Sequence, residues 1–82
     1  MNGSDDKNAA IPLSMAKTGQ YVQVVNIQAG WGLQRRLADM GLTPGIKVKV
    51  IGDQRQGCFV LDVRGSRLAL GRGISRKIMV KP

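Results

Sequence analysis

Residues 33–50 read LQRRLADMGLTPGIKVKV and decide the fold, because they carry a helix, its end, a turn and a strand in succession. Leu33, Leu37 and Met40 recur at i, i+4 and i+7, the spacing that places side chains on one face of a helix. We expect this apolar face to pack on a small sheet, since so short a helix is marginal alone in water. Gly41 is the glycine expected just past a helix end, where the backbone turns left-handed.

Residue type and spacing also predict the turn and the strand that follow this helix. Residues 43–46 (TPGI) suit a type II turn, because proline fixes φ and glycine accepts a positive φ. From Ile46 to Ile51, apolar residues alternate with Lys47 and Lys49. The alternation predicts a strand with one apolar and one cationic face.

Four other segments have the composition and turn signals of strands. In chain order, the five predicted strands are residues 21–27, 46–51, 58–63, 66–70 and 77–81. A change of phase after Val24 indicates a bulge in the first strand, and Arg64-Gly65 is predicted to be a two-residue turn. Residues 71–76 can form one helical turn. The predicted fold class is mainly β: a small barrel of about five strands, with one short α-helix inserted after the first strand.

The chain has 82 residues, enough for one small domain. Residues 1–11 (MNGSDDKNAAI) are polar and unpatterned, which predicts a disordered leader before a single domain of residues 12–82. Leu13 and Met15 are expected to close one end of the core. Residues 52–57 (GDQRQG) are predicted to form a mobile hairpin loop.

Two single residues each allow two interpretations. Trp31 lies between Gly30 and Gly32, and it can cover the first helical turn or one end of the barrel. Alternatively it is an exposed binding residue, since its glycine neighbours supply no bulk to hide it. Cys58, the only cysteine, can be a small buried hydrophobic residue or a reactive thiol.

The chain lacks the residues that most catalytic and metal sites need. It has no histidine, no glutamate and one cysteine, so acid-base catalysis, a disulfide and a four-ligand zinc site have no obvious basis. The sulfur atoms of Met15, Met40 and Met79 are expected in core packing. We therefore expect a non-enzymatic protein without cofactor or metal. No signal peptide or apolar run of about 20 residues is visible, which favours a cytoplasmic location.

The charge is strongly basic, with 13 Lys and Arg against 5 Asp and Glu and a formal net charge of +8. Such a charge attracts phosphates or an acidic protein face. The cations predicted on the surface are Arg35, Arg36, Lys47, Lys49, Arg64, Arg67, Arg72, Arg76 and Lys77. They can form a merely solvated exterior or a binding surface.

The run RRLADMGLTPGIKVKV (35–50), followed by VRGSRLALGRGISRKIMV (63–80), resembles FeoA, a family of small cytoplasmic accessory proteins of bacterial ferrous iron uptake. The resemblance extends from Leu13 to the carboxyl terminus, and its most specific portion is Arg36 to Gly45. It implies an SH3-like barrel with a helix after the first strand. It also implies a partner, FeoB, a membrane permease with a cytoplasmic GTP-binding domain, which the family modulates by direct contact rather than by carrying iron.

The residues predicted to bind this partner are Leu33, Arg35, Arg36, Leu37, Met40, Gly41, Arg64 and Arg67. For Leu37 and Met40 a purely structural role is the alternative. The same surface leaves two other functions open: a nucleic-acid-binding SH3-like module, and a GTPase-activating factor that inserts an arginine. A similar module ends iron-dependent repressors, but this chain has no helix-turn-helix region. A monomer or weak oligomer is expected.

Overall fold

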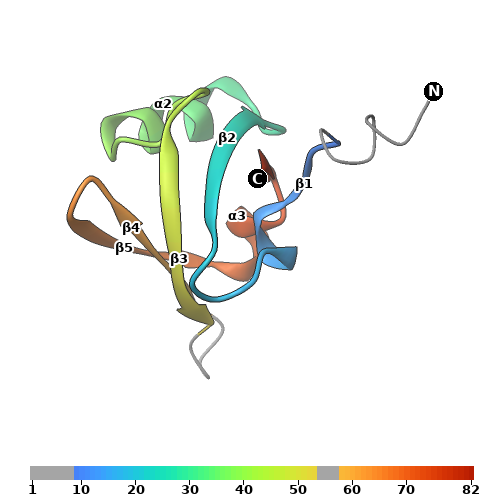
Figure 1. The fold of residues 1–82 in the computed structure, drawn as a ribbon. Helices are drawn as coiled ribbons and strands as arrows, with labels where there is room; N and C mark the ends of the chain where they lie inside the picture. Colours follow the sequence, from blue (N-terminus) through green and yellow to red (C-terminus); the bar gives the residue numbers. More distant parts are fainter. Residues whose placement is uncertain (1–8, 54–57) are drawn as a thin grey trace.

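The computed structural model describes residues 9–53 and 58–82, which form one antiparallel sheet, two short α-helices and one 3₁₀-helix around a single core (Figure 1). The strands lie in the order β1-β6-β2-β3-β4-β5. The elements are β1 (Ile11–Pro12), the 3₁₀-helix η1 (Leu13–Met15), β2 (Tyr21–Ile27), α2 (Trp31–Asp39), β3 (Lys47–Asp53), β4 (Cys58–Val63), β5 (Ser66–Gly71), α3 (Arg72–Ser75) and β6 (Ile78–Lys81).

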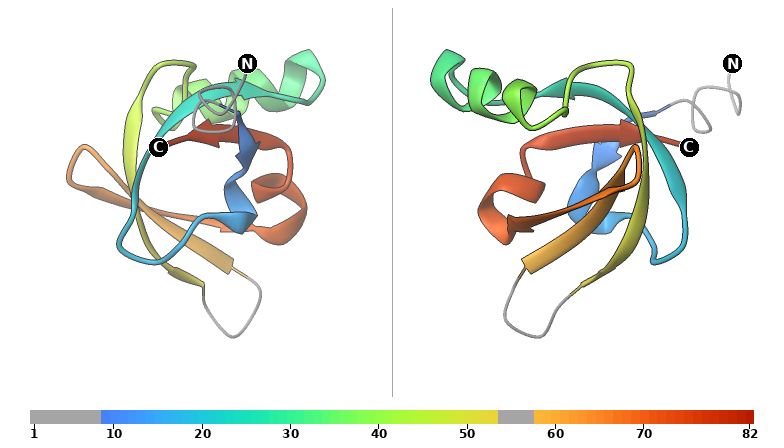
Figure 2. Two further views of the ribbon diagram at one scale, coloured as in Figure 1. Left: turned by 45° about the vertical axis from the view of Figure 1, so that its right-hand side comes forward. Right: turned by 90° about the vertical axis from the view of Figure 1, so that its left-hand side faces the viewer.

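The sheet curls into a small barrel, as the sequence predicted, and α2 lies across its upper end in the views of Figure 2. The edge strands β1 and β5 are not neighbours in the sheet; η1 and α3 contact each other between them. A register shift between Val24 and Asn26 confirms the bulge in β2 and returns Ile27 to the core. The core consists of Leu13, Val22, Val24, Ile27, Leu37, Leu42, Val48, Val50, Phe59, Leu61, Val63, Leu70, Ile78 and Val80.

The end of α2 is fixed by a pair of backbone hydrogen bonds. The Leu42 N–H donates to the Leu37 carbonyl at 2.8 Å, and the Gly41 N–H donates to the Ala38 carbonyl at 2.9 Å. With φ of +95° at Gly41, this is the Schellman arrangement that a glycine after a helix favours. The turn at residues 43–46 follows directly, with φ of +96° at Gly45. The predicted helix end and turn are therefore both confirmed.

Several details differ from the sequence predictions. A sixth, very short strand begins at Ile11, which pairs with Val80, because a two-residue strand has too little pattern to be recognised. Helix α2 begins at Trp31 rather than Leu33. Met15 is 68% exposed and does not close the core. The predicted leader (1–11) and hairpin loop (52–57) fall largely on residues 1–8 and 54–57, outside the described residues.

Met40 is also misplaced by the sequence pattern, since it is 42% exposed although its i+7 spacing from Leu33 predicts burial. The helix has already ended at Asp39, so Met40 leaves the helical path. Leu42, beyond the glycine, is fully buried instead. The chain thus uses the residue after the turn, rather than the last residue of the periodic pattern, to anchor this end of the helix.

Two glycines of the helix region give a matched test of this cap. In Gly41→Ala, the left-handed φ of +95° strains the new side chain, so we expect the free energy of unfolding to fall by about 1–2 kcal/mol. In Gly32→Ala, inside α2, the added methyl group meets nothing within 4 Å. The free energy of unfolding of this variant should rise by about 0.5 kcal/mol. Urea unfolding measures the change in the free energy of unfolding for both variants. If Gly41→Ala left this free energy unchanged, the proposed role of Gly41 in ending the helix would be contradicted.

Candidate functional site

The predicted partner-binding residues do not all reach the surface. Leu37 is 1% exposed and belongs to the core, whereas Leu33 is half-buried and packs against that core. Its burial is what the structural interpretation of Leu37 predicts. Both leucines hold α2 on the barrel, and the residues on the other sides of the helix remain available for contacts.

Arg35 and Arg36 are both exposed, as predicted, but they belong to different flanks of α2. Successive residues of an α-helix are rotated by about 100°, because one turn takes 3.6 residues. Arg35 lies on the flank of Trp31 and Ala38, and it lines a hollow with them. Arg36 lies on the flank that leads to Met40. The two arginines therefore serve separate surfaces.

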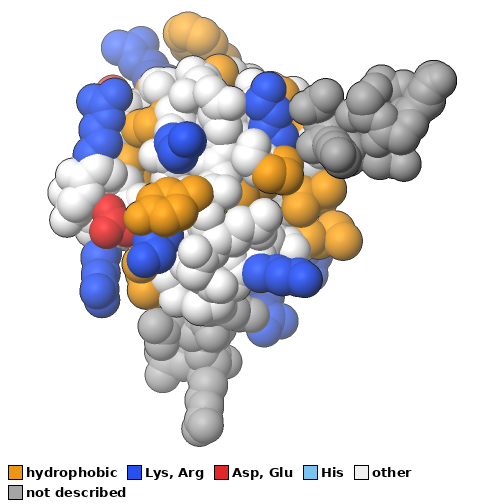
Figure 3. Space-filling view, in the orientation of Figure 1, with side chains coloured by type: hydrophobic (Ala, Val, Ile, Leu, Met, Phe, Trp, Pro, Cys, Tyr) orange, Lys and Arg blue, Asp and Glu red, His pale blue; other side chains and the backbone are white. Residues whose placement is uncertain are grey.

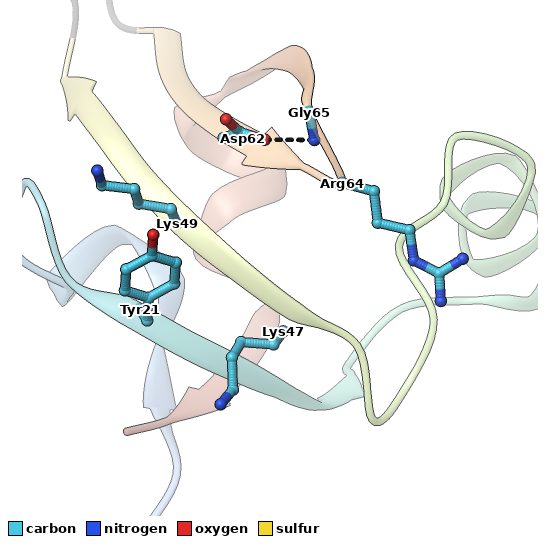
Figure 4. A pocket seen from close by; sticks show the side chains of 6 residues that line it. All are labelled: Tyr21, Lys47, Lys49, Asp62, Arg64 and Gly65. Carbon is cyan, nitrogen blue, oxygen red and sulfur yellow. Dashed lines mark hydrogen bonds between the residues drawn. The ribbon is translucent and has the colours of Figure 1, made fainter.

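The carboxyl end of α2 lies beside the turn between β4 and β5. A Cβ atom at Gly41 would be 3.4 Å from Cγ1 of Val63, the last residue of β4. The next residue, Arg64, opens the two-residue turn with φ of +54°, and the Gly65 N–H closes it by donating to Oδ1 of Asp62 at 2.7 Å. Figure 4 shows the Arg64 side chain extending toward the loop after α2.

Helix end and turn thus bring four of the predicted residues together. We call this the α2–turn surface; it consists of Arg36, Met40, Gly41 and Arg64. Arg67 lies further from the helix, on β5, where it is the register partner of Asp62 on the neighbouring strand β4.

A second exposed area, the Trp31 hollow, lies on the opposite flank of α2. Its volume is about 350 Å³, and its apolar walls are Ile27, Trp31, Ala38, Leu42 and Pro44. Gln34, Arg35 and Thr43 supply the polar part of the lining. Trp31 is 76% exposed, so the prediction that it covers the helix or the barrel end is wrong. Figure 3 shows hydrophobic side chains at the top of the molecule, over α2, with basic side chains beside them.

A third area is a row of side chains across four strands. Tyr21 on β2 is opposite Lys49 on β3, Lys49 is opposite Asp62 on β4, and Asp62 is opposite Arg67 on β5. The ammonium of Lys49 lies 5.5 Å from the centre of the Tyr21 ring, within the range of a cation–π contact. Figure 4 shows Tyr21 between Lys47 and Lys49, beside a hollow of about 280 Å³.

Within residues 9–53 and 58–82, no three His, Cys, Asp or Glu side chains gather as a metal would require. Over the same residues, no helix has the length and hydropathy needed to cross a membrane. Cys58 is half-buried.

Comparison with known proteins identifies the family. The family model described as FeoA domain matches residues 11–82. The chain belongs to the FeoA domain family. It is 46% identical over 70 residues to a protein of Methanocaldococcus jannaschii named "Putative Fe(2+) transport protein A", covering 85% of this chain and 84% of that protein. The FeoA resemblance drawn from residues 35–50 and 63–80 is confirmed, and it links the chain to ferrous iron transport.

Solved structures agree with this assignment. The crystal structure of an iron uptake regulatory protein (FeoA) is 36% identical, with a TM-score of 0.80 over 89% of this chain and 96% of that one. The FeoA fold therefore confirms the predicted SH3-like barrel. The repressor ScaR with bound Cd²⁺ has a TM-score of 0.81 at 22% identity, covering 88% of this chain but 35% of that one. This second likeness concerns the fold alone.

Proposed function

We propose that this FeoA protein is a non-enzymatic, cytoplasmic accessory module of ferrous iron uptake that binds the cytoplasmic GTPase part of a FeoB-type permease. Family membership and the iron-transport name of the relative support the assignment to ferrous iron uptake. The resemblance of Arg36 to Gly45 to the FeoA pattern supports the partner. The module acts by contact, and the iron passes through the permease.

The observation that carries the proposal is the meeting of the α2 end with the β4–β5 turn. A Cβ atom built at Gly41 would lie 3.4 Å from Cγ1 of Val63, so the end of α2 and the end of β4 are neighbours. The exposed Arg36 and Arg64 belong to these two segments. Met40 adds an exposed, adaptable thioether. A rigid cationic surface with one apolar element is suited to an acidic protein face, because complementary charge raises the rate of encounter and fixes orientation.

Isothermal titration of the permease's cytoplasmic domain with this protein tests the proposal. At physiological salt we expect a saturable one-to-one isotherm, and we expect binding to weaken as salt is raised, because exposed charges are screened beyond about 8–10 Å. The Lys17→Glu variant, altered in the loop at the far end of the barrel from α2, should bind as the unaltered protein does (Figure 1). An isotherm without saturation would contradict the proposal.

The alternative, a nucleic-acid-binding module, is favoured by the Tyr21 row. Tyr21 is 60% exposed and lies beside Lys47 and Lys49, and exposed aromatic rings between cations are the usual platform for single-stranded bases.

The alternative predicts that the affinity for a single-stranded RNA oligonucleotide falls steeply as salt is raised. It also predicts that Tyr21→Ala lowers this affinity roughly tenfold or more, as expected for the loss of one stacked base. Fluorescence anisotropy measures both. Under our proposal, binding is weak, indifferent to sequence and unchanged in Tyr21→Ala.

A further inference from the structure

We propose that the Trp31 hollow receives one large apolar side chain of the permease's cytoplasmic domain, next to a carboxylate that pairs with Arg35. This inference rests on the proposed function and specifies a second contact, on the opposite flank of α2 from the α2–turn surface.

The side chain of Trp31 is left largely in water, which is costly for so large an apolar group. At 76% exposure it is the most exposed of the large hydrophobic side chains in the described residues. Its neighbours Gly30 and Gly32 leave it uncovered, since neither carries a side chain. A tryptophan in this position contributes little to the core, whereas it offers a large apolar area to a partner.

The walls of the hollow are already fixed in place. Nε2 of Gln34 donates to the Ala29 carbonyl at 2.7 Å and ties the loop before α2 to the first turn. On the other side, Leu42 is held by its 2.8 Å bond to Leu37, and the adjoining Pro44 has a restricted φ. A site with fixed walls loses little conformational entropy on binding, which favours affinity.

The size and charge of the hollow indicate its occupant. A volume of about 350 Å³ is at the lower end of ligand sites, which favours one side chain over a larger cofactor. Arg35 is the only charged residue of the lining, and the chain carries a net charge of +8. A partner with an apolar residue beside an acidic one therefore matches the hollow in shape and in charge. Tryptophan and arginine are also the residues most often found to dominate binding at interfaces.

The test uses the fact that Trp31 is the only tryptophan of the chain. The permease's cytoplasmic domain, with its own tryptophans replaced by phenylalanine, is titrated while Trp31 emission and calorimetric heat are recorded in parallel. We expect the emission to move to shorter wavelength as the heat saturates. Trp31→Ala should raise Kd about 30-fold or more, the effect of a dominant interface residue.

Met15→Ala is the matched control, because Met15 is also a large exposed side chain, at 68%, but lies on η1. Its Kd should stay within about twofold, as for a residue outside an interface. Thermal melts confirm that both variants are folded. Normal binding heat with unchanged Trp31 emission would overturn the inference and leave the proposed function standing. Absence of binding would overturn both.

Two other occupants are distinguished by the same signal. Emission that shifts with anionic phosphatidylglycerol vesicles, but not with the permease domain, would assign the hollow to a membrane surface. Emission that shifts on raising the concentration of the protein alone would assign it to a second copy of the chain. Either result would overturn the inference.

Discussion

Replacing Leu37 by alanine is expected to lower the free energy of unfolding by about 3–4 kcal/mol, the middle of the usual range for buried leucines. Leu37 is 1% exposed, and its carbonyl accepts the Leu42 N–H that closes the helix. Truncation leaves a cavity between α2 and the sheet, at a position where the Schellman cap limits relaxation. For a domain of this size the loss is a large fraction of total stability.

Leu33→Ala is the matched control for this prediction. Leu33 lies on the same face of α2 but is only half-buried, so its truncation should cost about 1–1.5 kcal/mol, since less apolar area is lost. Urea unfolding followed by far-UV circular dichroism gives both values. Equal losses for the two variants would mean that α2 is not anchored mainly through Leu37.

Reversing the charge of both Arg36 and Arg64 is expected to weaken binding to the permease's cytoplasmic domain about 100-fold, because like charges brought together at an interface cost several kcal/mol. Both side chains are exposed, so neither change disturbs the core. The variant Arg36→Glu/Arg64→Glu should therefore melt close to the unaltered protein. Calorimetric titration at physiological salt measures the change in Kd.

The control must alter the net charge equally at another place. Lys17→Glu/Arg72→Glu does so, because both residues are exposed and lie away from α2, in the loop after η1 and in α3. We expect a small loss of affinity from the weaker overall attraction, several-fold at most. If the control double variant lost as much affinity as the Arg36 and Arg64 variant, the binding would reflect total charge and the α2–turn surface would have no special role.

Local chemistry explains why most of the fold was predictable. Gly41, Gly45 and Gly65 stand where the backbone has positive φ, and each marks a turn whose type limits the pairing of the strands around it. Strands β2 and β4 begin and end where alternation and turn residues indicated. The strand at Ile11 was missed because its only reason to form is a distant one, the pairing with Val80.

The candidate surfaces were predicted less completely, for a physical reason. A periodic pattern shows which face of a helix is apolar, but it does not show what covers the other faces. The exposure of Trp31 depends on the fold around it, and so does the approach of Gly41 to Val63. The separation of Arg35 from Arg36 was available from helical geometry, since neighbouring residues are rotated by about 100°. The glycines on both sides of Trp31 were the one signal for an exposed aromatic ring.

We propose that the barrel holds α2 and the β4–β5 turn together as one surface for the permease. A two-dimensional NMR titration of the labelled protein with the unlabelled cytoplasmic domain tests it most directly. We expect the amide signals of Arg36, Met40, Gly41 and Arg64 to shift or broaden in proportion to the fraction bound, while those of residues 16–20 stay unchanged. Saturable shifts confined to residues 16–20 and α3, with α2 and the turn unaffected, would contradict it.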